Sequence, residues 1–193
     1  MSKFMENQPI LKESTEENFW GETARFVLAA VLIALPIRLW IIQPFIVSGE
    51  SMVNTFQNAD YLIVDQVDYR FEAPQRGDVI IFKNPNNLSQ YYIKRIIGLP
   101  GETVEMTSTS VTIKNAAHPE GFALSEPYTS SGRDSTVSTT LGTDELFVMG
   151  DNRAASSDSR VWGPLKEQLI TGRALVRLWP PNKISLFPGK ATY

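Results

Sequence analysis

Short apolar runs of strand length fill most of the chain after residue 43, and glycine, proline and asparagine interrupt them at close intervals. Arg76-Gly77-Asp78, Asn84-Pro85-Asn86 and Leu99-Pro100-Gly101 are typical turn sequences. Runs of this length between such turns indicate antiparallel β structure. We therefore predict a mainly β fold over residues 43–193. The expected strands are Pro44–Ser48, Tyr61–Val67, Asp78–Phe82, Tyr91–Ile97, Thr103–Met106, Val111–Lys114, Glu145–Met149 and Gly172–Trp179.

One part of this β region has a different composition. Residues 102–144 are richer in serine and threonine and poorer in large apolar residues than their surroundings, as in Thr107-Ser108-Thr109-Ser110. We interpret them as an inserted hairpin region or small subdomain, less regular than the rest of the domain and partly mobile.

An apolar segment precedes the β region, from Phe19 to Ile42. Trp20 and Trp40 are 20 positions apart, and this separation along a helix is about 30 Å, the thickness of the hydrocarbon core of a bilayer. Both indoles could then lie at the interfaces while Arg25 and Arg38 reach outward. The segment therefore predicts one transmembrane helix over 19–42. A buried core helix is the alternative, and the small-x-small pattern of a cleaved signal peptide is absent after the segment.

The distribution of basic residues predicts the orientation of this helix. After Arg38 no lysine or arginine occurs until Arg70. An excess of basic residues marks the cytoplasmic side, so residues 1–18 are expected to form a cytoplasmic tail and residues 43–193 an extracytoplasmic domain. The basic residues that precede or open the span are Lys3, Lys12 and Arg25.

Composition excludes several classes of function. The chain has no cysteine and one histidine, which argues against a disulfide framework, thiolate catalysis and a zinc site of the usual ligands. Its 18 lysines and arginines form no basic run, so no nucleic-acid partner is expected. We expect neither a metal nor a cofactor.

Ser51, in Ser48-Gly49-Glu50-Ser51-Met52, is the candidate nucleophile. A serine hydroxyl needs an adjacent base, usually a histidine. The single histidine, His118, lies in a loop flanked by proline and glycine and is interpreted as a solvated residue. A neutral lysine is the other base known to serve a serine, and Lys94 is the best candidate.

Lys94 lies in Tyr91-Tyr92-Ile93-Lys94-Arg95-Ile96-Ile97, where strand alternation places Tyr92, Lys94 and Ile96 on one face. Burial among apolar groups lowers the pKa of a lysine from its ordinary value of about 10.4 and makes the amine available as a base. The alternative is a lysine on an edge strand whose amine reaches solvent.

A polar loop from Gly150 to Arg160 is the third feature. It contains two arginines, two aspartates and three serines within eleven residues. Arginines can bridge carboxylates with two parallel hydrogen bonds, and serine hydroxyls can both donate and accept. Such a loop could orient the lysine, or it could be a solvated charged turn between two strands.

Together these segments resemble the successive conserved motifs of bacterial type I signal peptidases, in the order of that family, over most of residues 43–182. The insertion after Lys94 is not covered by the resemblance. The similar segments are Ser48–Met52, Gly77–Phe82, Tyr92–Glu102, Gly150–Arg160 and Gly172–Pro180.

The resemblance implies a role for each matching residue. Ser51 would attack the scissile carbonyl, with its own N–H in the oxyanion hole, and Lys94 would act as the general base. Ser156 would position the lysine amine. The residues expected to order the polar loop are Asp151, Arg153, Asp158 and Arg160. The residues expected to line pockets for alanine-sized side chains are Phe45, Val47, Met52 and Ile93.

The same resemblance implies a membrane serine endopeptidase that removes signal peptides from exported preproteins with small-x-small cleavage sites. Its expected partners are these preproteins, the lipid bilayer and, transiently, the secretion translocon, in the cell membrane or a thylakoid membrane. Ser51 follows Ile42 by nine residues, which span at most about 30 Å when extended. The site would thus stay near the bilayer surface, in the plane of its substrate.

Two positions depart from the family pattern. Asn54 stands where the family usually has proline, which leaves the turn after the nucleophile less rigid, and Gly49 stands where some members have a hydroxyl residue. Two other functions are considered: another Ser-Lys peptidase of related fold, such as a conjugation-type maturation peptidase, and a membrane-anchored β domain that binds exported proteins without cutting them.

Overall fold

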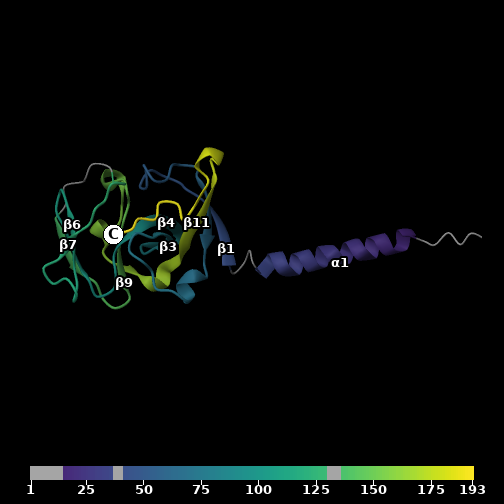
Figure 1. Cartoon of the computed structure of the whole chain (residues 1–193), viewed down its shortest axis with the longest axis horizontal. Coiled ribbons are helices and arrows are strands. Elements are labelled where there is room, and N and C mark those ends of the chain that lie inside the picture. The colour runs from purple at the N-terminus through teal and green to yellow at the C-terminus, as the bar shows by residue number, and fades with distance from the viewer. Residues whose placement is uncertain (1–14, 37–40, 130–135) are drawn as a thin grey trace, which may run out of the picture. The chain divides into compact units, whose positions relative to one another are not determined.

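The computed structural model describes residues 15–36, 41–129 and 136–193, and the chain divides into two units, residues 1–39 and 40–193. The first unit contains helix α1 (Thr15–Pro36), and the second contains all the strands (Figure 1).

Helix α1 differs from the transmembrane helix predicted over residues 19–42. It begins at Thr15, within the predicted tail, and ends at Pro36, and Ile42 is the first residue of a strand. Among the described residues, no helix is both long and apolar enough to cross a membrane. The predicted span is therefore not found in that form; Arg38 and Trp40 lie outside the described residues, as does most of the predicted tail.

The second unit is built on an eight-stranded antiparallel sheet, in agreement with the predicted mainly β fold. Seven strands lie in the order β1-β2-β11-β3-β4-β9-β10, and β12 pairs with β11. Their bounds are β1 (Ile42–Ile46), β2 (Tyr61–Asp65), β3 (Val79–Asn84), β4 (Asn87–Gly98), β9 (Glu145–Met149), β10 (Leu165–Lys166), β11 (Ile170–Trp179) and β12 (Ser185–Leu186).

The inserted region forms a second sheet of four antiparallel strands in the order β7-β6-β5-β8. In Figure 1, β6 and β7 lie at the end of the domain opposite β1. The strands are β5 (Thr103–Met106), β6 (Val111–Lys114), β7 (Phe122–Ala123) and β8 (Val137–Thr140). The insertion is thus a small β subdomain with regular strand pairing, although β8 has the sequence Val-Ser-Thr-Thr.

Short helical segments connect the strands and shape the loops. They are η2 (Asp68–Arg70), η3 (Arg153–Ala155), α2 (Ser159–Trp162), η4 (Glu167–Leu169) and η5 (Pro181–Lys183). Two of them, η3 and α2, belong to the polar loop predicted to orient the lysine.

Strand β4 runs between hydrophobic clusters that lie on its two faces. Ile96 packs in one cluster with Phe82 and Val148, whereas the next residue, Ile97, packs in another with the inserted sheet. The C-terminal half of β4 is therefore dry on both sides, and its burial pattern is continuous from Lys94 to Gly98. Lys94 and Arg95 lie in this half of the strand and are therefore shielded from solvent.

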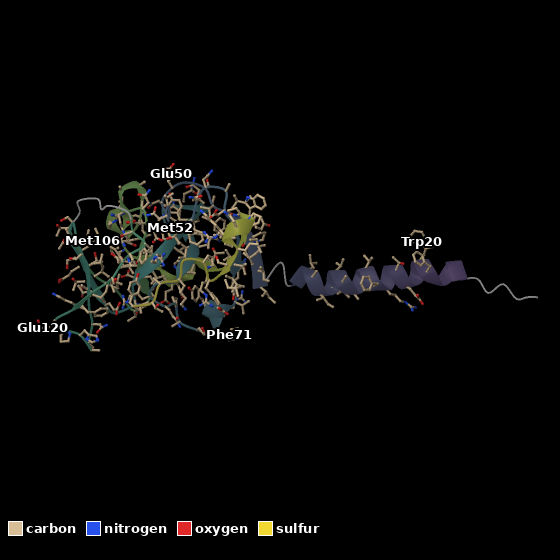
Figure 2. All side chains as sticks on the ribbon, turned by 45° about the horizontal axis from the view of Figure 1, so that its top comes forward. Trp20, Glu50, Met52, Phe71, Met106 and Glu120 are labelled. Atoms are coloured by element: carbon tan, nitrogen blue, oxygen red, sulfur yellow. The ribbon has the colours of Figure 1, made fainter. Side chains whose placement is uncertain are left out.

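A third cluster lies beneath the turn that carries Ser51. Met52 and Phe56 are almost completely buried there and pack with Leu62 and Ile81. Burial of a large apolar side chain contributes about 1.5–3 kcal/mol, so these two residues fix the turn to the sheet. Figure 2 shows Met52 inside the domain and Glu50 at its edge.

Candidate active site

Ser51 lies in a tight turn between β1 and β2. The amide of Val53 donates to the carbonyl of Glu50 at 3.1 Å, and the amide of Phe56 donates to the carbonyl of Met52 at 2.8 Å. These bonds begin a helical turn immediately after the nucleophile. The turn directs Met52 into the core and leaves Ser51 half-buried at the wall of a cleft.

Asn54 has a backbone angle that explains its departure from the family pattern. Its φ is +24°, and Gly49, on the other side of the nucleophile, has φ +97°. Asparagine tolerates a positive φ better than most residues, whereas proline is fixed near −65°. In this chain the turn is therefore built for asparagine, and a proline would not fit its conformation.

Lys94 lies directly against the candidate nucleophile. Its Nζ is 2.7 Å from Ser51 Oγ and 2.9 Å from the carbonyl oxygen of Ile93, and the residue is only 4% exposed. The amine also lies 5.3 Å from the centre of the Tyr92 ring. The structure thus brings Ser51 and Lys94 together and leaves Lys94 buried, not extended to solvent.

Burial lowers the pKa of the Lys94 amine from 10.5 to about 8. The carboxylates of Asp158 and Asp151 act in the opposite direction and raise this pKa, while the guanidinium of Arg160 lowers it further. Desolvation prevails over the two carboxylates. An appreciable fraction of the amine is therefore neutral near physiological pH and able to accept a proton.

Asp158 organises the polar loop behind the lysine. Its carboxylate is completely buried and accepts hydrogen bonds from Arg160 Nε at 2.7 Å and from the amide of Gly150 at 3.0 Å. Burial raises the pKa of this carboxyl, but the hydrogen bonds from Arg160 and the other donors outweigh it, and the pKa is lowered. The Arg160 guanidinium also donates to the carbonyl of Arg153 at 2.8 Å, which closes the loop on itself.

Ser156 is buried within the same loop. Its Oγ makes no hydrogen bond of ordinary geometry to a described residue, although the hydroxyl is near enough to Asp158 to help lower the pKa of that carboxyl. A Cβ at Gly150 would overlap both Ser156 Oγ and the carbonyl oxygen of Ser51. Glycine at position 150 thus allows the loop to pack against the nucleophile turn.

Two further loop residues connect to distant parts of the domain. Asp151 forms a buried ion pair with Arg95, with bonds of 2.8 Å from Nε and 2.6 Å from Nη2, and it accepts a hydrogen bond from Thr55. Arg153 donates to the carbonyl of Gly150 at 3.1 Å and forms an ion pair with Glu126 of the inserted region. The four charged residues predicted in the loop thus take part in three arginine–carboxylate pairs, Arg95–Asp151, Arg153–Glu126 and Arg160–Asp158.

Several residues that build the site were not predicted from the sequence. Asn152 donates from its amide to the carbonyl of Ser51 at 3.0 Å and from its side chain to the carbonyl of Glu50 at 3.1 Å. Arg95 is completely buried beside Lys94. The signal for Arg95 was present, because a second charged residue in the middle of an apolar strand requires a buried partner.

A cleft of about 290 Å³ opens beside Ser51 and Lys94. Three of the four predicted pocket residues line it, namely Phe45, Val47 and Ile93, whereas Met52 is 1% exposed and belongs to the core below. The cleft lies between β1, an edge strand, and the middle of β4. Its other lining residues are Ile46, Ser48, Gly49, Glu50, Leu62, Ile81, Tyr91, Tyr92, Ala155 and Ser157.

The remaining candidate for a base is outside this cleft. His118 is exposed in the loop between β6 and β7, with its ring against Phe122. Within the described ranges no group of three or more histidine and acidic side chains is arranged to bind a metal ion.

Comparison with known proteins identifies relatives of this chain. A family model described as "Signal peptidase, peptidase S26" matches residues 20–179. Signal peptidase I of Leptolyngbya laminosa is 36% identical over 185 residues, which cover 92% of this chain and 88% of that protein. Probable signal peptidase I-2 of Synechocystis is 33% identical, covering 93% and 83%. Thylakoidal processing peptidase 1 of Arabidopsis thaliana is 32% identical over 86% of this chain, which spans half of that longer protein.

Proposed function

Because the chain belongs to the signal peptidase family, peptidase S26, we propose that it is a membrane-bound serine endopeptidase that removes N-terminal signal peptides from exported preproteins. Ser51 is the nucleophile and Lys94 the general base. One observation carries the proposal: the buried amine of Lys94 lies 2.7 Å from Ser51 Oγ, at the wall of an apolar cleft.

The first half of the reaction uses the neutral form of the lysine. Lys94 Nζ takes the proton from Ser51 Oγ as this oxygen attacks the scissile carbonyl carbon. The resulting ammonium group gives the proton to the leaving amine, and the preprotein is released with a new N-terminus. The signal peptide is then an ester of Ser51, and a water molecule deprotonated by Lys94 hydrolyses it.

The backbone amide of Ser51 is the proposed donor to the oxyanion. In the described part of the chain this N–H makes no hydrogen bond, so it is available to a developing negative charge. One such donor is worth about 2.7–4 kcal/mol in related acyl-transfer reactions. Gly49 has no side chain to supply a second donor.

The polar loop keeps the lysine in place. Ser156 is proposed to orient the amine, and its buried hydroxyl, which makes no hydrogen bond of good geometry to any described residue, Lys94 included, has free capacity for this role. Asp158 with Arg160 orders the loop from within, and Asp151 and Arg153 attach it to β4 and to the inserted sheet.

The cleft fits an extended peptide with small side chains. Phe45, Val47 and Ile93 present apolar surface next to the nucleophile, and an edge strand forms one wall. A peptide strand that binds there can place alternate side chains in the cleft. Small residues at P1 and P3, as in an Ala-x-Ala site, agree with the modest volume of about 290 Å³.

Lipid is the proposed environment of α1. The described side chains of this helix are all exposed, and from residue 26 to residue 35 they are entirely apolar. A helix with such a surface binds lipid in preference to water. We place residues 43–193 outside the cytoplasm and infer transient contact with the secretion translocon, in a cell or thylakoid membrane.

Cleavage of a purified preprotein with an Ala-x-Ala site tests the proposal. The full chain in lipid should release the mature protein, with its new N-terminus directly after the second alanine by mass spectrometry, and Ser51→Ala should release none. Binding of the preprotein without cleavage by the folded wild type would instead support a binding module. Cleavage confined to another class of protein would support a different Ser-Lys peptidase.

A further inference from the structure

The last residues of the domain, Phe187–Tyr193, form a segment that we call the strap. After β12 the strap crosses back over the domain, as the yellow end of the chain shows in Figure 1. The amide of Phe187 donates to the carbonyl of Leu175 at 2.7 Å, and the amide of Ala191 donates to the carbonyl of Gly77 at 3.3 Å. None of its residues lines the cleft beside Ser51.

Two glycines allow the strap to lie close to the rest of the domain. A Cβ at Gly77 would overlap the carbonyl oxygen of Ala191, and a Cβ at Gly189 would overlap the methyl group of Thr55. Both glycines have a positive φ, +90° and +75°. Since Thr55 belongs to the turn that carries Ser51, the strap packs directly against the nucleophile turn.

The strap also covers the buried ion pair next to Lys94. The Arg95 guanidinium donates to the carbonyl of Gly189, as well as to that of Gly77 at 2.9 Å. The same guanidinium stacks 3.9 Å from the centre of the Tyr128 ring, and the hydroxyl of Tyr128 is hydrogen-bonded to that of Tyr193. Arg95 is thus held from outside by strap atoms and from inside by Asp151.

Short series of contacts connect the strap to both Ser51 and Lys94, the proposed catalytic dyad. Arg95 follows Lys94 in β4, and its partner Asp151 accepts a hydrogen bond from Thr55 of the nucleophile turn. The strap contacts Arg95 and Thr55 themselves. The strap therefore touches the residue that follows the base in β4 and one residue of the turn that carries the nucleophile.

We propose that the strap positions the catalytic dyad, with Gly189 and Tyr193 as positioning residues that hold Arg95 and the nucleophile turn in place. This inference rests on the proposed function, because it assigns a role in the same reaction. The strap acts through Arg95 and Thr55 and does not contact the substrate.

Loss of strap contacts should affect kcat more than KM. The guanidinium of Arg95 would gain freedom, and its charge would neutralise Asp151 less completely. The charged groups that act on Lys94 are Asp158, Asp151 and Arg160, so a less neutralised Asp151 raises the pKa of the lysine amine. The pH profile of kcat/KM should then move to higher pH. The cleft, which contains no strap residue, should bind substrate as before.

Tyr193→Ala in the full chain is the test, with Val137→Ala as the control. Val137 is partly buried and packs against the core of the inserted sheet, away from the dyad, whereas Tyr193 is 44% exposed. Tyr193→Ala should lower kcat about tenfold, which corresponds to a small displacement of reacting groups, and raise the midpoint of the pH profile, with KM within about twofold. Tyr193→Phe, which retains the ring, should fall between Tyr193→Ala and wild type.

Hydrogen exchange measured without substrate makes the test independent of cleavage. The amides of Thr55 and Phe56 both bond the carbonyl of Met52, at 2.9 and 2.8 Å, and should exchange faster in Tyr193→Ala than in Val137→Ala. Equal exchange rates and an unchanged pH midpoint in the two variants would overturn the proposal. If the wild type fails to cleave, the exchange data still decide the role of the strap, while the proposed function fails separately.

Discussion

The pH dependence of cleavage follows directly from the burial of Lys94. A pKa of about 8 for its amine leaves the neutral base at about 1% at pH 6 and about 90% at pH 9, and kcat/KM reports this fraction for the free enzyme. We therefore expect kcat/KM to rise about 90-fold between pH 6 and pH 9 and to level off above pH 9. A solvated lysine, with a pKa near 10.5, would give a rise of about 1,000-fold over the same range and no plateau.

Initial rates on a short fluorogenic peptide with an Ala-x-Ala site, measured from pH 5.5 to 10 in lipid at constant ionic strength, provide the assay. Circular dichroism across the same range identifies any pH at which the domain unfolds. A midpoint near pH 8 followed by a plateau is the expected profile. A rate that continues to climb tenfold per pH unit through pH 10, or a midpoint near pH 6, would refute the assignment of Lys94 as a buried base.

Substitutions at three positions test the surrounding structure. Asn54→Pro should destabilise the domain by more than about 1 kcal/mol in urea unfolding, because proline cannot adopt the positive φ of this position, whereas Asn54→Gly should change the free energy of unfolding by less than half as much. Asp151→Ala should cost about 3–5 kcal/mol, since it leaves Arg95 buried without its partner; an unchanged unfolding midpoint would contradict this. Gly150→Ala should reduce kcat at least tenfold, because the new Cβ overlaps Ser156 Oγ and the Ser51 carbonyl, and a fully active variant would show that the loop can shift freely.

The strands were predictable because apolar runs and turn residues are local features. Three of them, β5, β6 and β9, have the bounds predicted from the sequence, and β4 extends the predicted Tyr91–Ile97 at both ends. Strands β7, β10 and β12 were missed because two residues are too few to show a period, and β8 was missed because its residues are mostly serine and threonine.

The helix was the least accurate prediction. The spacing of Trp20 and Trp40 predicted a membrane span over 19–42, whereas α1 covers Thr15–Pro36 and Ile42 already belongs to β1. Residues 37–40, Trp40 among them, lie outside the described residues.

In the site, chemistry was easier to predict than geometry. The loop position of His118 made Lys94 the better candidate for the base, and the structure places that amine against Ser51. Contacts across long sequence separations had no such signal: the pairing of Arg95 with Asp151 and the contact of Asn152 with Ser51 depend on how β4 and the polar loop fold together. Strain at Asn54 was equally hidden, because φ cannot be read from a residue type.

Acylation by a serine-directed covalent probe, located by mass spectrometry of the digested protein, tests the Ser51–Lys94 dyad most directly. The wild type in lipid should be acylated at Ser51, at a rate that follows the neutral fraction of Lys94. Lys94→Met, checked by circular dichroism to be folded, should be labelled at least about 100-fold more slowly, the contribution expected of a general base. Labelling of Ser51 at the wild-type rate in folded Lys94→Met would contradict the dyad.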